Sequence, residues 1–308
     1  MNAERRKSIT PETIVFLVAT AVAIMLTITG LLINEHSLVV VLALSVAFAG
    51  IPHGALDVWV GYRAALWRTW RGAIAFHLGY LAAVGAVIVT WHVLPGVSLA
   101  LFLACSGWHF ADDWRLPTMQ RIAVGAAMLA LPAWIWPDEV LRIFKVLSGE
   151  SGAVIAHALE TAGPALGVAM SICVLILLRR SLVSGVELIV MAGLAVLLPP
   201  LIYFGVYFCA LHSPRHFRLT AAQSSQLSRS RLIAITALYT CLTLVGAVMA
   251  WTWLASADAT QLSNNTLSVI FIGLAALTVP HMCVIAAAEK TMKTSVNSKM
   301  RLFADISV

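Results

Sequence analysis

The sequence predicts an all-α protein whose helices form a polytopic bundle in a membrane. Hydrophobic residues make up 60% of the 308 residues and charged residues only 11%, and the mean hydropathy is +0.91. Soluble domains balance apolar and charged residues far more evenly. The net charge of +6 is typical of basic loops on one side of a membrane, so it does not indicate nucleic-acid binding.

The apolar runs predict about ten membrane-spanning helices. Their ranges are 13–33, 37–60, 73–92, 97–114, 121–136, 153–178, 185–198, 201–217, 231–255 and 266–287. The first run is long enough to cross the membrane and lacks a small-residue cleavage site, so we interpret it as a retained helix. Pro199 and Pro200 separate the seventh helix from the eighth, because proline cannot continue a helix ladder.

The distribution of Lys and Arg predicts that both termini lie in the cytoplasm, since these residues concentrate in cytoplasmic loops. Basic residues flank alternate predicted loops, and the intervening loops lack them except for 138–152, which holds Arg142 and Lys145 beside acidic residues. The chain therefore divides into a basic cytoplasmic tail (1–12), a single transmembrane domain (13–287) and a cytoplasmic tail (288–308).

Five histidines fall late in helices that run from the outside inward, so they are predicted to share one depth. They are His53, His109, His212, His216 and His281. The spacing of the HxxxH pair 212–216 places both imidazoles on one helix face. Neutral imidazoles bind divalent metals, and unpaired polar rings are costly within lipid. The pattern predicts a metal site, with hydrogen bonding between helices as the alternative.

Carboxylates accompany these histidines at helical spacing. Asp57 follows His53 by four residues, and Asp112 and Asp113 follow His109 by three and four. A carboxylate often accepts the second ring N–H of a ligand histidine and thereby orients it. We expect this role for Asp57 first and Asp112 second, while direct ligation stays open; Asp113 is interpreted as solvated.

The motifs that hold these residues resemble the Brp/Blh family of bacterial and archaeal membrane β-carotene 15,15′-dioxygenases. The matching segments are PHGALD at 52–57, WHFADD at 108–113, ALHSPRH at 210–216 and PHM at 280–282. The resemblance covers roughly residues 45 to 285. One departure is Ala111, where the family pattern leads us to expect a glycine.

The resemblance implies a non-haem Fe(II) ion held by His53, His109, His212 and His216. His281 lies in a matching motif but is not carried over as a ligand, so we expect it beside the ligands. The implied reaction cleaves the central 15,15′ double bond of β-carotene with O₂ and gives two molecules of retinal. The family also implies the bacterial inner membrane, with its lipid, as the location and a functional link to a retinal-binding rhodopsin.

Aromatic residues near the histidines suit a carotenoid, because aromatic faces pack well against a conjugated polyene. The candidates for substrate binding are Trp59, Trp108, Tyr203, Tyr207 and Phe208. The alternative is that aromatic residues near helix ends anchor the protein at the membrane interface.

Two other functional classes stay open. One is a membrane di-iron oxygenase or desaturase acting on another lipid, although such enzymes need more histidine boxes than the single HxxxH here. The other is a metal or proton transporter lined by His and Asp. A retinal-binding rhodopsin is disfavoured for this chain itself, because every lysine lies in a tail or a loop, away from the predicted helices.

Overall fold

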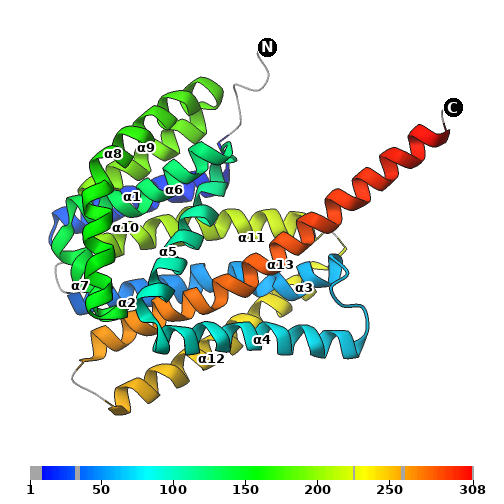
Figure 1. The fold of residues 1–308 in the computed structure, drawn as a ribbon, viewed down its shortest axis with the longest axis horizontal. Coiled ribbons are helices and arrows are strands. Elements are labelled where there is room, and N and C mark those ends of the chain that lie inside the picture. The colour runs from blue at the N-terminus through cyan, green and yellow to red at the C-terminus, as the bar shows by residue number, and fades with distance from the viewer. Residues whose placement is uncertain (1–8, 32–34, 225, 258–260, 307–308) are drawn as a thin grey trace.

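The computed structural model describes residues 9–31, 35–224, 226–257 and 261–306, and side chains only as far as residue 291, those at 35, 256 and 257 excepted. Within these residues the chain is helical and contains no strand, which confirms the all-α prediction. The helices form a bundle from which the last turns of the C-terminal helix project (Figure 1).

The helices follow one another with short connections. In order they are α1 (Pro11–Ile28), α2 (Glu35–Ser45), α3 (Asp57–Arg63), α4 (Trp70–Val93), α5 (Pro95–Ala111), α6 (Thr118–Ile135), α7 (Pro137–Ser148), α8 (Glu150–Arg180), α9 (Leu182–Leu197), α10 (Pro200–Tyr207), α11 (Ser213–Ala222), α12 (Arg229–Ala257) and α13 (Leu262–Ile306). Helices α6 to α9 pack on one another, and α13 packs on α3, α4 and α12. Helix α5 contacts members of both groups, and α10 contacts α9 and, through the rings of Phe204 and Phe271, α13.

In the described part of the chain, seven helices are long and apolar enough to cross a membrane. They begin at Pro11, His36, Trp70, Thr118, Glu150, Arg229 and Leu262. The other three predicted spans correspond to α5, to α9 and to the α10–α11 segment, which are shorter or interrupted. The total of about ten crossings and the cytoplasmic placement of both termini therefore stay predictions.

The predicted loop at 138–152 contains a helix that the sequence analysis did not predict, α7 (Pro137–Ser148). Val140, Ile143 and Leu147 are buried along one face, at the three- and four-residue spacing of an amphipathic helix. Lys145 lies on the open face. The charged residues interspersed along the segment make it too polar to be predicted as a membrane span. The predicted tail 288–308 is also helical as far as Ile306, as a continuation of α13.

Next to two of the histidines, the backbone hydrogen bonds depart from the regular α-helical pattern. A π-helical turn at Val46–Gly50 leads into a 3₁₀ turn at Ile51–Leu56, which carries His53. A second π-helical turn at Phe208–His212 precedes α11. Pro52 and Pro214 lack the N–H that a regular α-helix needs here, so the ladder must adjust. Such π turns often occur at functional sites because they re-aim side chains.

Glycines bring the helices near the histidines into close contact. A Cβ atom on Gly125 of α6 would collide with the backbone of Gly107 on α5. A Cβ atom on Gly50 would lie 2.7 Å from the ring of Phe208. These approaches fix α5 against α6, and the first π-helical turn against the second, so the segments that carry His109, His53 and His212 have little freedom to separate.

Candidate metal centre

The structure brings together the five histidines that the sequence analysis grouped at one depth, from four separate parts of the chain. His53 comes from the 3₁₀ turn, His109 from α5, His212 and His216 from the second π turn and α11, and His281 from α13. The closest ring centres are those of 212 and 216 at 4.6 Å, 109 and 212 at 4.8 Å, and 109 and 216 at 4.9 Å. The ring centre of His281 lies 5.3 Å from that of 53, 5.5 Å from that of 109 and 6.3 Å from that of 216. The ring centre of His53 lies 5.7 Å from that of 212 and 6.2 Å from that of 216.

Several ring nitrogens in this cluster have no hydrogen-bond partner. The Nε2 atoms of His109, His212 and His281 are buried and unpartnered. One nitrogen each from His109, His212 and His216 lies within 4.8 Å of the other two. An unpartnered buried polar atom costs about 1–3 kcal/mol. A divalent metal would satisfy these lone pairs, so the donor set fits such an ion.

The second nitrogen of two of these rings is fixed by a neighbour. Nδ1–H of His212 donates to Oδ2 of Asp113 at 3.1 Å, and Nδ1–H of His53 donates to the carbonyl of Gly50. A neutral imidazole that donates through Nδ1 keeps its lone pair on Nε2. Both rings therefore hold the tautomer that suits metal binding through Nε2.

The structure changes the predicted roles of the carboxylates. Asp113, expected to be solvated, has a side chain that is only 1% exposed and lies beside His212. Asp112, expected beside a ligand, is 45% exposed and pairs with Arg121 at 3.1 Å. The 3₁₀ turn after α5 is the reason, because it directs the first aspartate outward and the second inward. Asp57 lies beside His281 at 2.8 Å rather than beside His53.

Only part of the predicted aromatic lining lies against the histidines. The ring of Phe208 stacks on His212 with centres 5.8 Å apart and lies 5.6 Å from His53. Tyr207 lies 5.9 Å from His212, with its hydroxyl donating to Asp113. Phe110, which follows His109 in the sequence, lies 4.9 Å from His212. These rings form an apolar wall on one side of the cluster.

The other three predicted lining residues make different contacts. The Tyr203 hydroxyl donates to the carbonyl of Met128. Trp108 is 40% exposed and receives the guanidinium of Arg121 over its ring. Trp59 stacks on Tyr62. None of these contacts is with a histidine of the cluster, and substrate binding by the three residues stays a prediction.

A network of buried charges continues from Asp113 away from the histidines. Arg215 binds Glu187 at 2.6 Å and lies 3.8 Å from Glu12, and one of its nitrogens reaches the carbonyl of Asp113. Arg218 binds both oxygens of Glu12. The carboxylates of Glu12 and Glu187 are each 2% exposed. The network ties α1, α9 and α11 together beside the candidate metal centre.

Sequence reasoning missed Glu187 and Tyr80, yet both had a signal. Glu187 is an acidic residue inside an otherwise apolar predicted span, and an ionisable residue there calls for a partner. Tyr80 donates to Oδ2 of Asp57 at 3.0 Å from the middle of α4. A hydroxyl among apolar residues indicates a buried acceptor, but only the fold identifies that acceptor.

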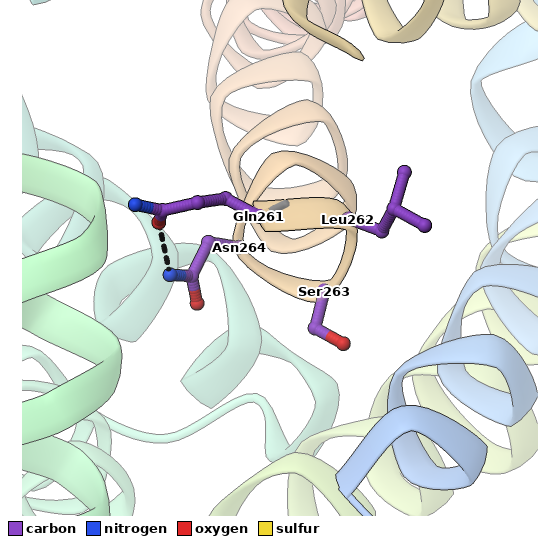
Figure 2. Close-up of a pocket in the computed structure, with 4 residues that line it drawn as sticks. All are labelled: Gln261, Leu262, Ser263 and Asn264. Atoms are coloured by element: carbon purple, nitrogen blue, oxygen red, sulfur yellow. Dashed lines mark hydrogen bonds between the residues drawn. The ribbon is translucent and has the colours of Figure 1, made fainter. Parts of the chain in front are cut away.

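The hollow drawn in Figure 2 lies away from this cluster. Gln261, Leu262, Ser263 and Asn264 line it at the start of α13, with the Asn264 amide donating to Gln261 at 2.7 Å (Figure 2). Asn264 lies about 25 Å along the helix from His281, given the rise of an α-helix. The hollow therefore shares no residue with the candidate metal centre.

Comparison with known proteins places these residues in a family context. A family model described as "Beta-carotene 15,15'-dioxygenase" matches residues 44–289. A protein named "Beta-carotene 15,15'-dioxygenase" from uncultured marine bacterium 66A03 is 31% identical over 251 residues, which cover 78% of this chain and 90% of that relative. No solved structure matches the chain. The matched residues include all five histidines of the cluster.

Proposed function

The chain belongs to the β-carotene 15,15′-dioxygenase family and is a carotenoid-cleaving dioxygenase, and from this we propose that it cleaves the central double bond of β-carotene at an Fe(II) centre. One β-carotene and one O₂ would give two molecules of retinal. The atoms and electrons balance without an external reductant, because both oxygen atoms enter the two aldehydes. The proposed location is the bacterial inner membrane.

The observation that carries this proposal is the convergence of imidazoles whose buried nitrogens lack partners. The proposed ligands are His53, His109, His212 and His216. An all-imidazole site suits Fe(II) as well as other divalent ions, and the family points to iron. When bound, the ion would supply the capacity to activate O₂ next to the alkene.

The protein's own residues would bind and orient the reactants. Asp113 and the Gly50 carbonyl would hold His212 and His53 in the ligand tautomer. The rings of Phe208 and Phe110 would pack against the polyene and keep water away from the histidines. A carotenoid is dissolved in lipid, so it would enter sideways between helices. Retinal would leave by the same route.

The proposal is tested in cells that accumulate β-carotene. Expression of this chain is expected to bleach the cells and to yield retinal as the main product in chromatographed pigment extracts. Longer apocarotenals would support oxidative cleavage and move its position along the polyene. Unchanged β-carotene with an iron-loaded protein would contradict the proposed substrate and favour the di-iron or other-lipid alternative. Unchanged β-carotene with a protein that binds no iron would favour the transporter.

Replacing Asp113 by asparagine is expected to weaken iron binding by about 10- to 100-fold, because carboxylates that orient a ligand histidine typically contribute this much. The matched change is Asp112→Asn, one residue earlier on the exposed side, which is expected to leave iron affinity unchanged. Titration of the purified apoproteins with Fe(II) under argon measures both affinities. Equal affinities in the two variants would contradict a role for Asp113 at the metal.

A further inference from the structure

His281 has an unusual combination of hydrogen bonds for a histidine in a membrane helix. Its Nδ1–H donates to Oδ1 of Asp57 at 2.8 Å, so its lone pair is on Nε2. That Nε2 atom is buried and has no partner, and the whole residue is only 5% exposed. Pairing with Asp57 accounts for one side of the ring and leaves the other side unexplained.

The same combination occurs at His212. There Nδ1–H donates to the buried Asp113, and Nε2 is buried without a partner. A carboxylate on one ring nitrogen and a metal on the other is the usual arrangement of a ligand histidine. His281 therefore resembles a proposed ligand more closely than it resembles a histidine that only joins two helices.

The position of the ring is compatible with a shared ion. With metal–nitrogen bonds of about 2.1 Å, the ring centres of two imidazoles on one ion lie at most about 6.4 Å apart. The His281 ring centre lies 5.3 Å from His53, 5.5 Å from His109 and 6.3 Å from His216. All three separations satisfy this limit. The donor nitrogens that lie within 4.8 Å of one another come from His109, His212 and His216, so sharing the ion requires His281 to approach that group.

Asp57 is held so that it can fix this ring. Its side chain is 6% exposed, and Tyr80 of α4 donates to the oxygen that His281 does not use. The ring of His281 thus has a defined orientation set by α3 and α4.

We infer that His281 is a fifth imidazole donor to the metal, through Nε2, and that Asp57 is its positioning residue. The inference rests on the metal centre proposed above and adds a ligand from the last helix. If His281 only connected α13 to α3, its buried Nε2 would stay without a hydrogen-bond partner, which destabilises the folded protein. Metal binding removes that cost.

Cobalt(II) substitution tests the inference without relying on catalysis, because the visible absorption of Co(II) strengthens as its coordination number falls. The wild type and His281→Ala are purified without metal and titrated with Co(II). The variant is expected to bind Co(II) about 10-fold or more weakly, taking the lower bound for loss of an orienting group, and to absorb more strongly. Added imidazole, which can enter the space left by the ring, is expected to restore the wild-type spectrum.

The matched control is His77→Ala. His77 is a partly buried histidine of α4 whose nitrogens bond to Tyr239 and the Ala73 carbonyl, so the Co(II) spectrum of His77→Ala should match that of the wild type. Should His281→Ala fail to fold, Asp57→Asn replaces it and is expected to shift the Co(II) spectrum and lower the affinity.

Co(II) bound with an unchanged spectrum in these variants would overturn the fifth ligand and leave the four-histidine centre intact. A wild type that binds neither Co(II) nor Fe(II) would overturn the metal centre itself.

Discussion

Replacing His212 by alanine is expected to abolish both iron binding and retinal formation. His212 is fully buried, it contacts His109, His216 and His53, and Asp113 fixes its tautomer. Loss of an orienting partner lowers metal affinity about 10- to 100-fold, so loss of the ligand itself should exceed about 100-fold. Iron content of the purified protein and retinal per cell measure the two effects.

His157→Ala serves as the control for this variant. His157 lies on the exposed surface of α8, where it pairs with Glu160 at 3.1 Å. Its replacement should therefore change neither the iron content of the protein nor the retinal formed per cell. Both proteins should reach the membrane in equal amounts, which immunoblotting of the membrane fraction checks. A His212→Ala protein that kept its iron and its activity would remove His212 from the ligand set.

Replacing Arg215 by methionine is expected to lower the free energy of unfolding by about 3–5 kcal/mol, because it leaves the buried carboxylate of Glu187 without its cation. Glu187 would lose a 2.6 Å ion pair, and Glu12 would keep only Arg218. Thermal denaturation in detergent micelles measures the change as a lower Tm.

Lys145→Met is the comparison for this effect. Lys145 and Glu150 form an ion pair at 3.1 Å whose side chains are 44% and 87% exposed. Exposed pairs of this kind contribute about 0–1 kcal/mol, so the Tm should hardly change. Similar shifts in the two variants would show that the Arg215 network does not stabilise the fold.

The sequence was sufficient to predict the helical class and the residues that meet, for physical reasons that act locally. Membrane helices need long apolar runs, and histidines inside such runs are conspicuous. The ranges of all ten predicted helices overlap helices of the structure. Helix α7 was not predicted, because an amphipathic helix with charges on one face lacks the long apolar run of a membrane span.

The partners of the histidines could not be predicted because they depend on local turns and on contacts between distant segments. Helical spacing paired Asp57 with His53, but the 3₁₀ turn redirects it, and its partner lies 224 residues away at His281. One turn likewise decides that Asp113 rather than Asp112 lies inside. Asp113 and His212 are 99 residues apart, and no pattern in one sequence connects them.

The bond between Glu12 and Arg218 sets a condition on how the protein is made. The two residues are 206 positions apart, so the ribosome completes most of the chain before the acid at the start of α1 meets its base. A charged carboxylate is costly within the bilayer, and Glu12 stands in the first turn of α1. During synthesis the first turn of α1 therefore stays at the water interface until Arg218 has been made, and it becomes buried in a late step of assembly.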